Sequence, residues 1–71
     1  MRYFFHVKNH GKVCHDGVGR RFININNAKS HAAVIANEFA IEAENYEGYS
    51  VCAVDENGNE IARVPIIRGF K

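Results

Sequence analysis

Three histidines and one cysteine near the amino terminus are the side chains best suited to binding a metal ion. They are His6, His10, Cys14 and His15. Imidazole and thiolate are common ligands of zinc and copper, and a turn at residues 9–11 brings His6 toward Cys14 or His15. Side chains alternate between the faces of a strand, so Cys14 and His15 cannot both meet His6 easily. We therefore predict no metal and no other cofactor; His6, His10 and Cys14 are the ligands of a metal-binding alternative.

Side chains suited to catalysis are few. Ser30 and Ser50 are the only hydroxyl nucleophiles besides the tyrosines. Ser30 and His31 are neighbours on a predicted helix and point about 100° apart, so they do not form a nucleophile–base pair. The acidic residues crowd the later part of that helix and the last hairpin and do not face one cleft. We expect a protein without enzymatic activity.

The first part of the chain predicts a hairpin that positions the histidines. Residues 2–8 alternate as a strand, with Tyr3, Phe5 and Val7 on one face and Phe4 and His6 on the other. After the turn, residues 12–14 return as a second strand. The sequence Asp-Gly-Val-Gly at 16–19 then breaks regularity, and residues 20–23 resume the strand briefly.

The spacing of apolar residues next predicts a helix from Ile25 to about Asn45. Asn24 suits the N-cap position, Gly48 ends the helix, and Phe22 packs back on the first turn. The predicted buried stripe spans about 100° of the helix surface. It consists of Ile25, Ala28, Ala32, Ile35, Ala36, Phe39, Ala43 and Tyr46.

A second hairpin completes the fold. Residues 49–54 and 60–64 read as strands joined by a turn with Asn57-Gly58, and Pro65 marks a strand end or a sheet edge. Ile66, Ile67 and Phe70 form an apolar tail that folds back on the body. The fold class is therefore α+β, a two-layer sandwich in ββαββ order. A four-stranded antiparallel sheet carries one long helix across one face, and residues 1–71 form a single domain.

The charges are unevenly placed although the net charge is only +1. Residues 30–60 hold seven acids and no Lys or Arg, whereas a candidate basic surface lies earlier in the chain. This skew has three explanations: neutral drift on a tolerant surface, attraction between the opposite ends of two copies, or nucleic-acid binding with Tyr3 and Phe4 stacking on bases. Nucleic acid is possible but not favoured, because the total charge is near zero. The basic residues are Arg2, Lys8, Lys12, Arg20, Arg21 and Lys29.

Val34 and Ile41, with Glu38 beside them, lie one heptad apart on the face opposite the buried stripe. That spacing favours contact with a second helix, so the leading hypothesis is a non-enzymatic protein-interaction domain. It acts as a homodimer or with another protein partner, through this patch or an open sheet edge. The alternative is a nucleic-acid-associated regulatory module, similar in layout to a small antitoxin. No apolar run is long enough to span a membrane, and no signal-peptide core is present. We expect a cytoplasmic protein, where Cys14 and Cys52 remain free thiols.

The motifs along the chain resemble a family of short uncharacterised proteins from rhizobia and related alphaproteobacteria. The resemblance rests on the opening Arg-Tyr-Phe-Phe-His, on Asp16 with Gly19, on Ala28 and Ala32 in the helix, on Val-Asp-Glu-x-Gly at 54–58, and on the final Val-Pro. It spans nearly the whole chain. Asn24 stands where the family more often has Asp, and Tyr49 where a Trp is common nearby. The resemblance implies the fold and a bacterial origin, and it implies no activity.

Overall fold

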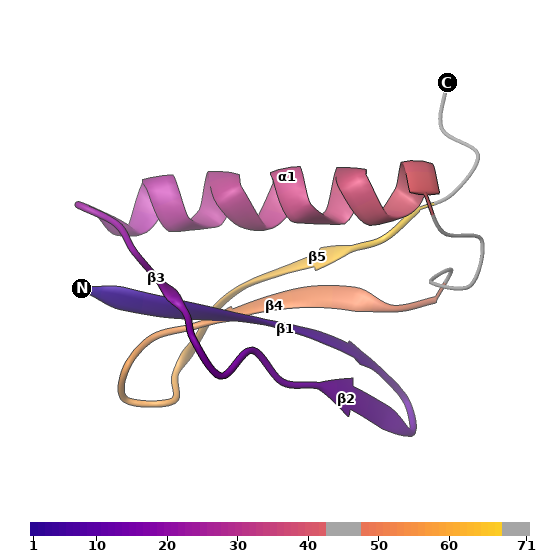
Figure 1. Ribbon diagram of the computed structural model, residues 1–71, viewed down its shortest axis with the longest axis horizontal. Coiled ribbons are helices and arrows are strands. Elements are labelled where there is room, and N and C mark those ends of the chain that lie inside the picture. Colours follow the sequence, from indigo (N-terminus) through magenta and orange to yellow (C-terminus); the bar gives the residue numbers. More distant parts are fainter. Residues whose placement is uncertain (43–47, 68–71) are drawn as a thin grey trace.

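The computed structural model describes residues 1–42 and 48–67, which form one helix and an antiparallel sheet (Figure 1). The strands of the sheet follow the order β2-β1-β4-β5, and β3 also pairs with β1. The predicted α+β architecture with one helix is confirmed. The predicted four strands become five, because residues 20–21 pair with the start of β1. The elements are β1 (Arg2–Asn9), β2 (Lys12–Cys14), β3 (Arg20–Arg21), α1 (Ile25–Glu42), β4 (Ser50–Val54) and β5 (Glu60–Pro65).

Strands β2 and β3 are two parts of one broken sheet edge beside β1. Val7 pairs with Cys14, and Tyr3 pairs with Arg20. Between these pairs, residues 4–6 of β1 lie opposite residues 15–19. The edge segment is therefore two residues longer than the part of β1 that it faces. A ladder of backbone hydrogen bonds cannot absorb such a difference. The interruption coincides with the Asp-Gly-Val-Gly segment, whose glycines and aspartate favour a turn.

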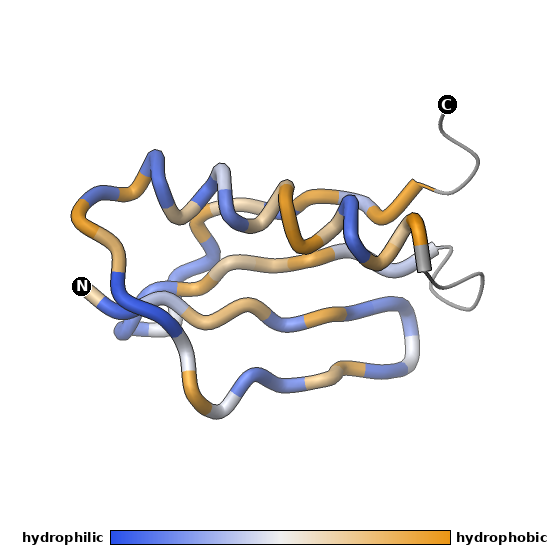
Figure 2. Tube along the Cα trace, turned by 45° about the horizontal axis from the view of Figure 1, so that its top comes forward, coloured by the Kyte–Doolittle hydropathy of each residue, from blue (hydrophilic) through white to orange (hydrophobic). Residues whose placement is uncertain are grey.

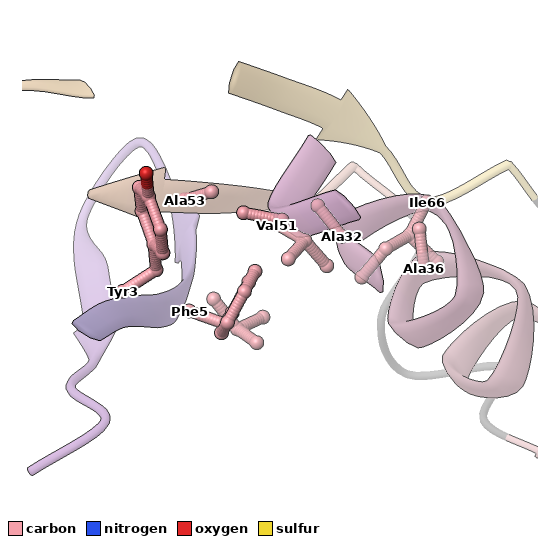
Figure 3. Packing of buried hydrophobic residues seen from close by; sticks show 9 residues of the cluster. Tyr3, Phe5, Ala32, Ala36, Val51, Ala53 and Ile66 are labelled. Atoms are coloured by element: carbon pink, nitrogen blue, oxygen red, sulfur yellow. The ribbon is translucent and has the colours of Figure 1, made fainter. Parts of the chain in front are cut away.

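The core lies between the sheet and α1. Tyr3, Phe5 and Val7 face it from β1, as strand alternation predicts, and Val51 and Ala53 face it from β4. From α1 it receives only small side chains at its centre: Ala28, Ala32 and Ala36 are at most 3% exposed. Alanine lets the helix backbone approach the sheet closely, so a larger side chain at Ala32 would overpack the interface by about 1–3 kcal/mol. Figure 3 shows these side chains gathered with Ile66 in one cluster.

One detail of the predicted core is wrong, and so is the predicted role of Tyr3 in stacking on bases. Ile25 is 42% exposed although it belongs to the inward stripe. Ile25 is the first residue of α1, and this 18-residue helix, about 27 Å long, is longer than five-residue β4, about 17 Å, one of the strands it packs against. Tyr3 is only 5% exposed, so its ring is not available for stacking on bases. Ala43, Tyr46 and the predicted helix end at Asn45 lie outside the described residues.

The turns and caps follow local chemistry closely. The side-chain oxygen of Asn24 accepts a hydrogen bond from the Asn27 N–H at 2.9 Å, which confirms the predicted N-cap. In the β4–β5 turn, Asp55 Oδ1 accepts from the N–H groups of Asn57 and Asn59, both at 2.9 Å. Gly58 completes that turn with φ 88°, a left-handed conformation that favours glycine. The hairpin is therefore a five-residue loop organised by Asp55, with the predicted Asn-Gly pair inside it.

The end of β5 behaves as predicted. Pro65 is the last residue of β5, which lies at an edge of the sheet order. The Ile66 N–H donates to the Tyr49 carbonyl oxygen at 2.9 Å, and the Ile66 side chain is 3% exposed. Ile67, by contrast, is 63% exposed, so of the two described tail residues only Ile66 returns to the core. Phe70 lies outside the described residues.

Hydropathy follows the two layers of the fold. In Figure 2 the turn between β1 and β2 is hydrophilic, whereas apolar stretches of β1 and β4 run beneath the helix. Within residues 1–42 and 48–67, α1 lacks the length and apolar character needed to cross a membrane.

Candidate functional site

The motif residues of the amino-terminal half meet at the broken sheet edge, where Asp16 is the central side chain. Its Oδ2 accepts a hydrogen bond from the Phe5 N–H of β1 at 3.1 Å. Its Oδ1 accepts from the N–H groups of Val18 at 3.0 Å and Gly19 at 3.1 Å. In return, the Asp16 N–H donates to Nδ1 of His6 at 3.0 Å. One aspartate thus replaces the strand pairing that the two extra residues interrupt.

These contacts determine the charge states of both side chains. Partial burial raises the pKa of Asp16, but the N–H groups of Gly19, Val18 and Phe5 outweigh it and hold the pKa below its usual value. The pKa of His6 is lowered by burial and then by its electrostatic interactions with His15 and Lys8, which together outweigh the opposing effect of Asp16. A neutral imidazole is what the hydrogen bond requires, because Nδ1 must be unprotonated to accept from Asp16.

Gly19 and Arg2 complete this edge. Gly19 has φ 75°, and a Cβ built there would lie 2.8 Å from Cε2 of Phe4 and 2.9 Å from Cγ of Arg2. Arg2 donates from Nη1 to the Val18 carbonyl oxygen at 2.9 Å. The Asp-x-x-Gly and Arg-Tyr-Phe-Phe-His motifs are therefore two halves of one structural joint. Their polar groups form hydrogen bonds to each other's segments and so stabilise the fold.

The candidate metal ligands are divided between the two faces of the sheet. The rings of His6 and His15 have centroids 5.0 Å apart, whereas Cys14 pairs with Val7 and takes the other face, as alternation predicts. His10 is exposed in the β1–β2 turn. Among the described residues, no three His, Cys, Asp or Glu side chains are grouped to hold a metal ion. Cys14 and Cys52 are free thiols, the first exposed and the second buried.

The candidate basic surface is split into two groups. Arg2 pairs with Arg21 at the start of β1, and Arg20 lies 5.6 Å above the Phe22 ring nearby. Lys8 lies near the other end of β1, about 20 Å away at strand rise, and Lys12 pairs with Asn9 in the same hairpin. Lys29 is exposed in the second turn of α1. This separation follows from the length of β1, whose two ends carry Arg2 and Lys8.

Lys8, from the second of these groups, lines a pocket that sequence reasoning missed. The pocket has a volume of about 280 Å³ and lies on the helix-free face, where β1 ends and β4 begins. The sequence analysis considers Lys8 and His10 for other roles, and Gly48, Ser50 and Arg63 come from distant parts of the chain. Lys8 pairs with Ser50 across β1 and β4, and Arg63 pairs with Cys52 across β5 and β4. These two pairings place the cations Lys8 and Arg63 beside the same pocket. The lining residues are Lys8, Asn9, His10, Gly48, Ser50 and Arg63.

The predicted interaction patch lies on the outer side of α1. Val34 is 48% and Ile41 82% exposed, and Glu38 is exposed beside them. Next to this patch, a groove of about 280 Å³ separates α1 from β5 and the residues that follow it. We call the patch and the groove together the α1–β5 surface. The groove is lined by Ala33, Ala36, Asn37, Val64, Pro65 and Ile67.

Comparison with known proteins places the chain in a family. Residues 2–68 match the family model described as Domain of unknown function (DUF6894). The chain belongs to this family. No curated protein and no solved structure matches the chain. Membership covers the whole described fold, including the joint around Asp16, and its description assigns no activity. The function must therefore be argued from the surfaces of the domain.

Proposed function

We propose that this domain is a non-enzymatic protein-interaction module that forms a homodimer through the α1–β5 surface. The observation that carries the proposal is the exposure of Val34 and Ile41, seven residues apart on the side of α1 turned away from the sheet. Residues at this spacing lie on one side of a helix and pack against a second helix. The non-enzymatic part is supported by His31, whose ring packs against Phe5 and Phe22 at 5.1 and 5.3 Å.

The size of the surface supports including the groove. A standard interface buries about 800 Å² on each partner, roughly one sixth of the 4921 Å² surface of this chain. The outer side of α1 alone, about 27 Å long and 10 Å wide, offers about a third of that area. The adjoining apolar groove, with Pro65 and the 63% exposed Ile67, extends the contact.

A second copy is the occupant that the charges favour. Residues 20–29 contain Arg20, Arg21 and Lys29 and no acid, whereas residues 38–47 contain four glutamates and no base. When two copies of α1 pack antiparallel, Glu38 lies near the midpoint of the seam, and Lys29 near the start of one helix lies toward the carboxyl-terminal end of the other. Val34 of each copy then faces Ile41 of its partner. Opposed helix dipoles and opposite charges both favour this arrangement over a parallel one.

Sedimentation velocity over about 10 μM to 1 mM protein tests the proposal. We expect a concentration-dependent dimer that Ile41→Glu weakens at least about tenfold, because each dimer then buries two unpaired charges. Ile23→Glu is the matched control, since Ile23 is 94% exposed and lies outside the α1–β5 surface. A wild-type chain that stays monomeric throughout, or equal effects of both variants, would contradict the proposal.

The cellular location of the protein and its source are part of the same proposal. Two free thiols, Cys14 and Cys52, support a reducing compartment such as the cytoplasm. The opening Arg-Tyr-Phe-Phe-His and the Asp-Glu-x-Gly turn support an alphaproteobacterial source. Fractionation of native cells tests the location: the chain is expected with the cytoplasmic proteins, and recovery from the periplasm or membranes would refute it.

A further inference from the structure

We propose that the pocket at the end of β1 is a binding site for a phosphate-type oxyanion, such as the phosphate group of a small phosphomonoester. The inference does not rest on the homodimer, because the pocket lies on the helix-free face and the α1–β5 surface does not. Lys8 and Ser50 are cross-strand partners, so their side chains project from the same face of the sheet. Arg63 enters from β5, the strand beyond β4.

The charges around the pocket favour an anion. Its lining holds two cations, Lys8 and Arg63, and no acidic residue among those described. The nearby acid, Glu60, is already occupied by Arg63: Nε donates to Oε2 and Nη2 to Oε1, both at 3.0 Å. Within the described residues, Lys8 has no ion-pair partner. One positive charge therefore remains uncompensated beside the pocket.

The pairing with Glu60 also orients Arg63. A bidentate carboxylate fixes the plane of the guanidinium group. With Nε and Nη2 committed, Nη1 is the nitrogen of Arg63 that has no bond to the described residues. A pair this exposed contributes little stability. Its value here is positional, because it fixes the guanidinium group of the pocket-lining Arg63 while Nη1 keeps no bond to the described residues.

The donor set and the volume define the ligand class. Ammonium, guanidinium and hydroxyl donors come from Lys8, Arg63 and Ser50, on three strands. A tetrahedral phosphate offers acceptor oxygens in several directions, whereas a carboxylate offers only two oxygens in one plane. The volume of about 280 Å³ is at the lower limit for small-molecule sites, about 300 Å³. The site therefore suits a phosphate carried by a small molecule rather than a large cofactor.

The test is titration of the full-length chain with inorganic phosphate, AMP, sodium acetate and a short single-stranded oligonucleotide. Binding is followed by ¹⁵N NMR and calorimetry. We expect phosphate and AMP to shift the amide signals of Lys8 and Ser50, and acetate to bind more weakly. Lys8→Met should weaken phosphate binding about tenfold or more, since it removes a charged donor. Lys12→Met, the matched control in β2 outside the pocket, should change it less than about twofold.

The outcomes separate the possible sources of the phosphate. Binding of AMP that depends on Lys8 supports a small phosphomonoester. Oligonucleotide binding that depends on Lys8, without AMP binding, supports the same oxyanion site with a nucleic-acid backbone as its source. The proposal is overturned if neither phosphate nor AMP nor the oligonucleotide binds, or if Lys8→Met and Lys12→Met weaken binding equally. Should Lys8→Met fail to fold, Ser50→Ala leaves all charges in place. It should still weaken phosphate binding several-fold, and unchanged binding would overturn the proposal.

Discussion

Replacing Asp16 by alanine tests whether one side chain joins the two halves of the broken sheet edge. The change removes the acceptors of three N–H groups, those of Phe5, Val18 and Gly19. The bonds from Phe5 and Gly19 are partly buried and the bond from Val18 is exposed. Counting about 1 kcal/mol for each partly buried bond and less for the exposed one, the expected loss is about 2–3 kcal/mol.

That loss is large for a chain of this size. At about 0.05–0.15 kcal/mol per residue, 71 residues correspond to a free energy of unfolding of about 4–11 kcal/mol. The melting temperature should fall by about 10 °C or more. Urea unfolding followed by far-ultraviolet circular dichroism measures the free energy directly. Asp16→Asn keeps one carboxamide oxygen and should lose about half as much.

Asp55→Ala is the matched control for this experiment. Asp55 also accepts hydrogen bonds from two backbone N–H groups, but both lie within its own turn and neither belongs to another strand. The variant should therefore be less destabilised than Asp16→Ala. The reasoning fails if Asp16→Ala stays within about 0.5 kcal/mol of the wild type, or if both alanine variants lose the same stability.

Two further predictions concern pH and thiol reactivity. Burial lowers the pKa values of His6 and His31 below 6.5 in the folded chain, so the unfolded chain binds more protons just below pH 6.5. Their contribution to stability is complete above pH 6.5 and is lost as the pH falls through the folded-state values. Urea unfolding at several pH values should show this loss, and His6→Asn should reduce it; an unchanged pH dependence in that variant would refute the role of His6. In native protein a thiol reagent should modify exposed Cys14 quickly and buried Cys52, whose pKa is raised by burial, only on unfolding; equal rates would contradict the structure.

Features that depend on neighbouring residues could be predicted from the sequence. The N-cap at Asn24 and the turn around Asp55 depend on contacts within a few residues. The same is true of the separation of Cys14 from His15, because strand alternation is a property of consecutive residues. The core faces of β1 and α1 follow from apolar periodicity, except at Ile25, the first residue of α1, which is exposed.

The candidate sites depended more strongly on distant contacts. The exposure of Val34 and Ile41 follows from helical spacing, so the outer patch was predictable. The groove beside it required β5 to lie next to α1. The split of the basic residues, by contrast, follows from the length of the predicted strand β1, which carries Arg2 and Lys8 near its two ends. The groove does not follow from local pattern, because strand pairing joins residues that are far apart in the chain.

The sequence by itself determined the helix, the two hairpins and the faces on which most side chains lie, because helical and strand periods act over a few residues. Only the tertiary structure decided that Asp16 bonds to Phe5, eleven residues away, in place of a strand ladder. It also decided that Lys8, Ser50 and Arg63 surround one pocket. The physical reason is the same in both cases: backbone pairing across β1, β4 and β5 sets these distances, and the register is chosen by burial of the whole apolar face rather than by the residues that it brings together.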